Sequence, residues 1–215
     1  MNRQRGIPFV VSAPSGTGKT TVCRKLVERD AGVEFSISHT TRPMRPGERD
    51  GRDYHFVGRE EFAALVAADA FVEHAEYAGN LYGTSWKSID EPLLGGRDLL
   101  LEVEVQGALQ IRERRGDARF VFLLPPSMDE LERRLRGRGT DSQAVVARRL
   151  ALVRQELAAV HAFDYALVNE DVERTTQELQ DILLAERSGD PAAVRALHGR
   201  AGVVSRMASV LPMQG

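Results

Sequence analysis

The sequence predicts an α/β fold in which a mostly parallel sheet is covered by helices on both faces. Strand-like apolar segments alternate with helix-like segments through most of the chain, an order typical of βαβ units. The alternation begins with a short apolar strand at Pro8–Ser12, a turn rich in Gly, Pro and Ser at Ala13–Gly18, and a helix at Lys19–Arg29. The length of 215 residues suits one compact domain with small inserts.

The later elements follow from similar local signals. Further strands are predicted at Asp98–Val105, Arg119–Leu124 and Tyr165–Val168. Further helices are predicted at Ser85–Leu94, Gln106–Arg115, Asp141–Val160, Thr175–Arg187 and, as a short one, Ala192–His198. Pro92 should bend the first of these or end it early. Another helix should begin at Ser127, which forms a capping box with Glu130. Arg136–Thr140 interrupts this helical pattern, and the tail, residues 188–215, is given no function.

An insert separates the two parts of the core, which are residues 6–35 and 85–187. The insert, about residues 36–84, starts with a stretch rich in Arg, Pro and Gly that has little periodicity. It continues with an amphipathic helix at Glu60–Asp69, followed by Phe71–Tyr77 and Leu81–Tyr82 on either side of a Gly79-Asn80 turn. This hairpin signal predicts that the insert carries its own small sheet.

Composition excludes several classes of protein. Apolar residues make up 42% and charged residues 28%, and no apolar run approaches the roughly 20 residues that span a bilayer. The net charge of −2 gives no reason to expect nucleic-acid binding. Cys23 is the single cysteine, so neither an intrachain disulfide nor a cysteine metal cluster can form. We read the basic and then apolar N-terminus as a first strand rather than a signal peptide, and we expect the protein in the cytoplasm.

The strongest local signal is a phosphate-binding loop. Its residues are Ala13, Pro14, Ser15, Gly16, Thr17, Gly18, Lys19 and Thr20, which match G-x-x-x-x-G-K-[ST] except at Ala13. In such a loop the backbone N–H groups hold phosphate oxygens, the lysine reaches the β- and γ-phosphates, and the Thr20 hydroxyl can bind Mg²⁺. The alternative is a Gly-rich turn with a solvated lysine. The flanking strand and helix disfavour it, as does the lysine itself, since only three of the 29 basic residues are lysines.

Five segments carry a resemblance to a known family. In chain order they read SAPSGTGKT, SHTTRPMRPGERDGRDYHF, FVEHAEYAGNLYGTS, LPPSMDELERRLRGRGT and ALVNED, and together they resemble bacterial guanylate kinases over about residues 6–187. Alanine at the first loop position is usual in such enzymes. The resemblance implies the P-loop nucleoside-monophosphate kinase fold, with a GMP-binding insert and a mobile lid at about residues 134–150. It implies an ATP:GMP phosphotransferase that uses Mg²⁺, gives ADP and GDP, and also accepts dGMP.

The resemblance assigns the guanine-binding residues. Glu73 takes the carboxylate role, because a carboxylate can accept from both N1–H and N2–H₂ of guanine. Ser38 and Thr84 take the hydroxyl roles and would donate to O6. A random Glu in a hairpin is more often a solvated strand residue, so the motif context carries this assignment.

The phosphate of GMP is assigned to Arg42, Arg45, Tyr54 and Tyr82. Arginine forks match phosphate geometry, and a tyrosine hydroxyl adds a neutral donor. The alternative is a generic basic loop, which the abundance of arginine makes reasonable outside the TTRPMRPGE context.

Two acidic residues depart from the usual family pattern. Glu102 and Glu104 stand where many members carry aspartate. The resemblance places Glu102 near Mg²⁺, often through water, and Glu104 near guanine. The extra methylene of glutamate could alter either fit.

The remaining assignments concern the lid and the ATP base. Arg134, Arg138 and Arg149 are expected to stabilise the transferred phosphoryl group together with Lys19. The neighbouring Arg133, Arg136 and Arg148 are expected to be surface charges. Asn169 is expected near the base or ribose of ATP.

Two other functions compete with this interpretation. One is a catalytically inactive guanylate-kinase-like module that binds phosphopeptides, and the other is a kinase of the same architecture for another phosphorylated acceptor. The retained lysine and arginines disfavour the first, and Glu73 with its hydroxyl partners disfavours the second. The expected partners are ATP and GMP, with no nucleic acid or membrane, and homo-oligomer formation is left open.

Overall fold

The computed structural model describes residues 5–77, 79–136, 143–199 and 202. The chain forms two compact units, which are described separately. The first unit contains residues 5–9 and Gly32–Ala118, and the second contains Val10–Ala31 and the chain from Arg119 onward. Within the described residues, every helix is too short or too polar to span a membrane.

Strand pairing gives a five-stranded sheet with the order β2-β7-β1-β8-β9. Its strands are β1 (Pro8–Ser12), β2 (Val33–Phe35), β7 (Asp98–Glu102), β8 (Arg119–Leu124) and β9 (Tyr165–Val168). In the first unit β2 pairs parallel with β7, with Val33 opposite Asp98, and in the second unit β8 pairs parallel with β9. Nearly all residues of β1, β7 and β8 are buried, as a parallel sheet covered on both faces requires. The predicted α/β class is confirmed.

The first unit also contains the small sheet that the hairpin signal predicted. Its order is β4-β3-β6-β5, and its strands are β3 (His39–Thr40), β4 (His55–Phe56), β5 (Phe71–Tyr77) and β6 (Asn80–Ser85). The long antiparallel pair of β5 and β6 is joined by a tight turn in which Gly79 has a φ of +77°, a conformation that favours glycine. β6 extends three residues beyond the predicted Leu81–Tyr82, because it pairs with β5 as far as Ser85.

The helices of the first unit are α2 (Arg59–Ala67), α3 (Trp86–Leu94) and α4 (Val105–Arg114). Ser85 begins α3, since its hydroxyl accepts from the backbone N–H of Ser88. Pro92 lies inside α3 and does not end it early, since the helix continues to Leu94. The predicted strand at Asp98–Val105 is too long. It stops at Glu102, because Glu104 is already the residue that precedes the first turn of α4.

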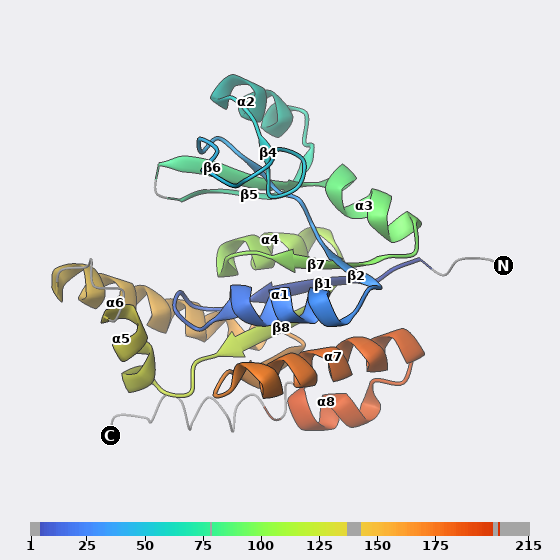
Figure 1. Ribbon diagram of the computed structural model, residues 1–215, viewed down its shortest axis with the longest axis vertical. Coiled ribbons are helices and arrows are strands. Elements are labelled where there is room, and N and C mark those ends of the chain that lie inside the picture. The colour runs from blue at the N-terminus through green and yellow to red at the C-terminus, as the bar shows by residue number, and fades with distance from the viewer. Residues whose placement is uncertain (1–4, 78, 137–142, 200–201, 203–215) are drawn as a thin grey trace. The chain divides into compact units, whose positions relative to one another are not determined.

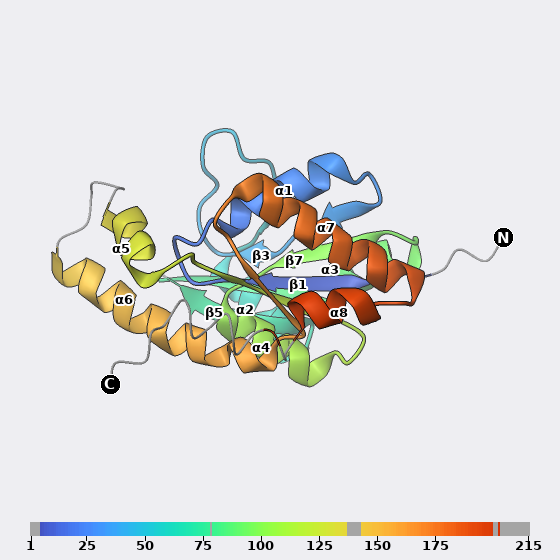
Figure 2. The same ribbon diagram turned by 90° about the horizontal axis from the view of Figure 1, so that it is seen from below.

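The helices of the second unit are α1 (Lys19–Arg29), α5 (Met128–Arg136), α6 (Gln143–Ala158), the 3-10 helix η1 (Ala159–Ala162), α7 (Val172–Ser188) and α8 (Ala192–His198). α1 and α7 lie side by side in both views (Figures 1 and 2). α7 begins three residues before the predicted start, because the Asp171 carboxylate caps it by accepting from the Arg174 N–H. The predicted helix Asp141–Val160 ends instead in η1, and its first two residues lie outside the described residues.

The tail contributes a helix that is tied to the second unit. Arg195 of α8 donates to Glu186 at 2.8 Å, and the Glu186 side chain is only 3% exposed. Arg119 donates to the same carboxylate. Burial opposes the charged form of Glu186, but hydrogen bonds from the Tyr165 hydroxyl, Arg119 and Arg195 together lower the pKa of this carboxyl below its ordinary value. Residues 190–198 therefore belong to the folded unit.

Candidate functional site

The phosphate loop of the second unit runs from the end of β1 to the start of α1. Gly16 and Gly18 have φ angles of +89° and +95°, which glycine adopts without the strain that other residues would incur. Gly18 precedes the first turn of α1 and has no side chain to cap it. The first N–H groups of the helix therefore suit the oxygens of an anionic ligand, and Lys19 stands at the first helical position.

Two side chains from distant parts of the same unit form hydrogen bonds to the backbone of this loop. The carbonyl oxygen of Thr17 accepts from Asn169 Nδ2 at 2.6 Å and, at a longer 3.4 Å, from Arg134 Nη1. Asn169 is 2% exposed, and a Cβ on Gly18 would lie 2.7 Å from its Nδ2. Asn169 thus holds the loop backbone through a contact that spans 152 residues of sequence and that no local pattern indicates. Its assignment to the ATP base stays a prediction.

Buried polar atoms lie at the same place. Thr17 Oγ1 and Asn169 Oδ1 are buried and have no hydrogen-bond partner within the described part of the protein. Buried polar groups are normally satisfied, so water or a nucleotide group is the expected partner of each.

The lid arginines are described only in part. Arg134 of α5 donates through Nε to Glu130 at 2.7 Å, and the pKa of Glu130 is lowered by hydrogen bonds from Arg134 and then Arg133. Ser127 caps this helix as predicted, because its hydroxyl accepts from the Glu130 N–H. Arg133 is 78% exposed, in keeping with a surface charge. Arg149 lies half-buried on α6, while Arg138 lies outside the described residues.

The carboxylate of Glu73 is the most deeply buried acidic group of the first unit's small sheet. A β-bulge between Phe71 and Glu73 shifts the register, so that Glu73 lies opposite Thr84 on β6. Three consecutive residues, Phe71–Glu73, are buried as a result, where regular alternation would turn one of them outward. Glu73 itself is 6% exposed. The bulge therefore aims a charged group into the interior of the unit.

Two hydroxyls line up behind this carboxylate. Thr84 Oγ1 donates to Glu73 Oε1 at 2.6 Å, and Ser38 Oγ lies 3.1 Å from Thr84 Oγ1. Because the Thr84 proton is directed at Glu73, Ser38 must donate to Thr84. The structure thus brings together the three residues predicted to read guanine, in a chain that runs from Ser38 through Thr84 to Glu73. Donation to O6 of a purine, which was predicted for both hydroxyls, would require at least one of them to turn.

Burial raises the pKa of Glu73 above its ordinary value, and the hydrogen bonds from Thr84 oppose this effect. The carboxylate therefore takes up a proton at a higher pH than an exposed glutamate does. Within the described residues, the hydrogen bonds that affect its pKa come from the neutral hydroxyl and the backbone of Thr84. Ligand N–H donors would therefore stabilise its charged form.

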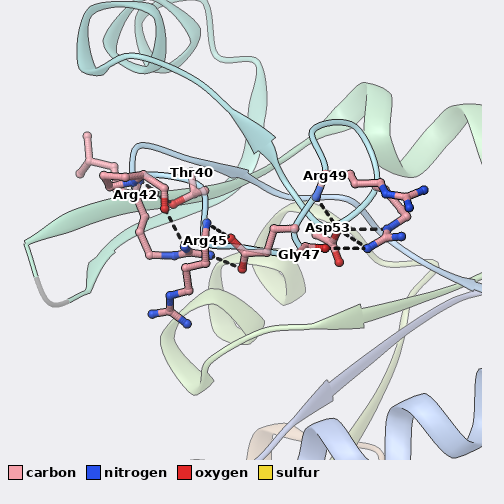
Figure 3. A network of polar contacts seen from close by, with 10 residues as sticks. Thr40, Arg42, Arg45, Gly47, Arg49 and Asp53 are labelled. Carbon is pink, nitrogen blue, oxygen red and sulfur yellow. Dashed lines mark hydrogen bonds and ion pairs between the residues drawn. The ribbon is translucent and has the colours of Figure 1, made fainter.

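The basic loop of the first unit is ordered by one acidic residue. Arg42 donates to Glu48 through both terminal nitrogens, at 2.7 and 3.1 Å, and Glu48 also accepts from the Arg45 N–H (Figure 3). The pKa of Glu48 is lowered, chiefly by Arg42. Figure 3 shows the Arg45 guanidinium pointing away from this network. Sequence reasoning missed Glu48, although the residue stands inside the quoted RPGE segment.

Two tyrosines complete this cluster. The Arg42 guanidinium lies 5.5 Å from the centre of the Tyr54 ring, and the Tyr54 and Tyr82 rings meet edge to face at 6.1 Å. Burial and the neighbouring Tyr82 raise the pKa of Tyr54, so its hydroxyl stays a neutral donor. Arg42, Tyr54 and Tyr82 therefore lie together, as the phosphate-binding assignment requires.

The last residue of β7, Glu102, and the acidic residue just after the strand, Glu104, differ in their surroundings. Glu102 is half-buried at the end of the strand, whereas Glu104 is exposed and precedes α4 without capping it through its side chain. Thr20 is exposed on the first turn of α1. Across residues 5–77, 79–136 and 143–199, no group of three or more His, Cys, Asp or Glu side chains could hold a metal ion. Thr20 and Glu102 each carry an oxygen ligand of the kind that Mg²⁺ takes alongside phosphates and water.

Comparison with known proteins decides the family. The guanylate kinase family model matches residues 5–186. The chain belongs to the guanylate kinase family. The guanylate kinase of Syntrophotalea carbinolica is 50% identical to it over 184 residues, which make up 86% of this chain and 88% of that protein. The guanylate kinase of Lactococcus lactis is 47% identical over 86% of this chain and 90% of its own length.

A solved guanylate kinase shares the fold. The crystal structure of guanylate kinase from Anaplasma phagocytophilum matches with a TM-score of 0.69 and 38% identity, over 86% of this chain and 88% of that chain. The resemblance drawn from the five sequence segments is thereby confirmed. The roles of the individual residues remain predictions, because neither the family model nor these relatives test them.

Proposed function

We propose that this chain transfers the γ-phosphoryl group of ATP to GMP, giving ADP and GDP. The observation that carries the proposal is the buried Glu73 carboxylate with Thr84 and Ser38 behind it, in a member of the guanylate kinase family. The phosphate loop before α1 would bind the triphosphate of the donor nucleotide.

Base selection is assigned to Glu73, Ser38 and Thr84. Guanine N1–H and N2–H₂ donate to the carboxylate, and a turned hydroxyl donates to O6. Adenine carries an acceptor at N1 and lacks the N2 donors, so it would leave the buried carboxylate facing a lone pair. Sites of this kind reject the wrong base strongly, because a buried polar group is left unpaired.

Phosphate binding is assigned to two further sets of residues. Arg42, Arg45, Tyr54 and Tyr82 hold the GMP phosphate, and Ala13–Thr20 hold the phosphates of ATP, with Asn169 near the base or ribose of ATP. None of these roles touches the ribose 2′-hydroxyl, so the proposal extends to dGMP.

The chemical step needs no side-chain nucleophile, because the acceptor is already an anion. An oxygen of the GMP phosphate attacks the γ-phosphorus in line, and the bond to the bridging oxygen of ADP breaks. Lys19, Arg134, Arg138 and Arg149 stabilise the charge on the equatorial oxygens. Exclusion of water by lid closure lets GMP compete with hydrolysis.

Thr20 and Glu102 are the residues that would hold Mg²⁺, Glu102 through water. The ion supplies neutralisation of charge on the β- and γ-phosphates. A cytoplasmic location, which the single cysteine suggests, is part of the same proposal.

The inactive-module alternative gains no support from the described residues. Gly16 and Gly18 keep the phosphate-loop conformation, and Lys19 follows them directly. A binding module that had lost catalysis would not need either feature.

The test is phosphoryl transfer from ATP and Mg²⁺ to a panel of GMP, dGMP, AMP, CMP, UMP and dTMP. We expect strong and selective formation of GDP, with dGMP as the second acceptor. GMP binding without transfer would support the inactive module, and transfer to another acceptor would mean that the base assignment is wrong.

The lid assignment has its own test with a neighbouring control. Arg138→Ala should lower kcat by about 100-fold or more and leave the KM for GMP nearly unchanged, since its charge is needed in the transition state. Arg133→Ala, which removes an exposed surface charge, should leave kcat unchanged. An unchanged kcat in Arg138→Ala would remove that residue from the catalytic set.

A further inference from the structure

We propose that Gly107 and Gln110 of α4 are positioning residues, which fix the Glu73 carboxylate in the orientation that reads guanine. The inference rests on the proposed function and extends it to two residues without a role so far. It concerns only the first unit, in which α4 packs against β5.

Gly107 leaves the space that the carboxylate occupies. A Cβ built on Gly107 would lie 2.8 Å from Glu73 Oε2 and 3.3 Å from its Cδ, both closer than side chains normally approach. Gly107 is buried inside α4 and has no left-handed φ, so its conformation does not require glycine. Glycine within a helix is less favourable than alanine, so its presence there needs another reason. The close approach of Glu73 is the physical reason for a glycine at this position.

Gln110 fixes the backbone next to Glu73. Its side-chain Oε1 accepts from the His74 N–H at 3.1 Å, and its Nε2 donates to the His74 carbonyl at 3.1 Å. β5 is the edge of its sheet, so these backbone groups face away from β6. A single amide thereby satisfies both groups, as a neighbouring strand would, and ties β5 to α4 one residue after Glu73.

The two residues act at one place because of helical spacing. Positions three apart lie on the same face of a helix, so Gly107 and Gln110 both meet β5 beside the bulge. The carboxylate is then confined from two directions. Thr84 holds Oε1 from β6, and the Gly107 backbone limits Oε2 from α4. A carboxylate confined in this way loses little freedom when it binds two adjacent N–H donors.

The experiment measures KM for GMP, KM for ATP, kcat and the melting temperature of Gly107→Ala and Gln110→Ala. Matched controls are Gly116→Ala, where an added Cβ meets nothing within 4 Å, and Gln106→Ala on the exposed side of α4. We expect KM for GMP to rise about tenfold or more in both test variants, with KM for ATP unchanged. The melting temperature of Gly107→Ala should stay near that of the parent, because the helix preference of alanine offsets the cost of moving the Glu73 side chain. The controls should match the parent.

A double variant separates positioning from general damage. Glu73→Asp shortens the side chain by one methylene and makes room for the methyl group that Gly107→Ala introduces. The fold-increase in KM for GMP caused by Gly107→Ala should therefore be clearly smaller in the Glu73→Asp background than in the parent.

Three results would overturn the inference. An unchanged KM for GMP in Gly107→Ala would do so, as would equal effects of this change in the two backgrounds. A rise in both KM values together with a lower melting temperature would indicate a structural role alone. A parent that forms no GDP would instead reject the proposed function, and the positioning role would fall with it.

Discussion

The phosphate loop (Ala13–Thr20) and the cluster proposed to read guanine (Ser38, Glu73 and Thr84) are built by opposite means. The loop uses backbone N–H groups and two glycines with positive φ, all within Ala13–Thr20. The cluster uses side chains on β5, on β6 and in the segment before β3, and its Ser38 and Thr84 hydroxyls meet across 46 residues of sequence. One site is local and the other is assembled by the small sheet.

This difference decides how each site responds to change. A site built from backbone groups should tolerate most side-chain substitutions, apart from those at its glycines, its lysine and Thr20, which is proposed to hold Mg²⁺. A side-chain site depends on each member and on the residues that position them, since every buried polar group must keep a partner. Substitutions in the two regions should therefore separate into effects on ATP chemistry and effects on GMP recognition.

The largest effect is expected at Lys19. Lys19→Ala should lower kcat by about 1,000-fold, because a charge directed at the transferred phosphoryl group is lost while the loop backbone remains. KM for GMP should stay near that of the parent. Steady-state kinetics with Lys25→Ala as the control would check this, since Lys25 stands on the same helix and pairs with Glu173 on the surface. A kcat within a few-fold of the parent would contradict the phosphate-loop role.

Next in size is the effect of Glu73→Gln. An amide offers one acceptor and places its NH₂ against a guanine donor, so kcat/KM for GMP should fall about 100-fold with KM for ATP unchanged. Glu76→Gln, an exposed change on the same strand, is the control. Equal losses for GMP and ATP would show that the carboxylate supports the fold rather than base selection.

A smaller effect is expected at Asn169. Asn169→Ala removes the donor to the Thr17 carbonyl, and KM for ATP should rise about tenfold as the loop loses support, while KM for GMP is unchanged. Glu170→Ala, exposed and adjacent, should behave like the parent. If KM for GMP rose instead, the contrast between the two regions would not hold.

The smallest effect is a pH dependence. Because burial raises the pKa of Glu73, its charged form is lost as pH falls, starting at a higher pH than for an exposed glutamate. GMP N–H groups need that charged form, so KM for GMP should increase toward acidic pH. The GMP phosphate also titrates in this range, because phosphate monoesters have a second pKa of about 6. The difference between the pH profiles of the parent and Glu73→Gln isolates the carboxylate, and identical profiles would contradict the prediction.

The elements that were predicted correctly are those with local sequence signals, as the phosphate loop is. Strands β1, β8 and β9 and helix α1 have the predicted bounds, since their apolar patterns are continuous and their ends carry Gly, Pro or capping residues. The prediction for β7 extended three residues too far, because Val103 and Val105 are apolar on both sides of a helix start that has no side-chain cap. β2, β3 and β4 were not predicted, because two- and three-residue strands carry no periodicity and exist only through their partners.

The sequence by itself determined the α/β class, the phosphate loop and the family, because each is written in contiguous residues whose spacing has a local physical meaning. Only the tertiary structure decided that a bulge turns Glu73 inward, that Asn169 supports the Thr17 carbonyl, and that Gly107 leaves room for the carboxylate while Gln110 holds the backbone beside it. These contacts join residues far apart along the chain, and they depend on which faces of strands and helices meet. Burial and close approach are properties of packing, so they become visible only when the partners are in place.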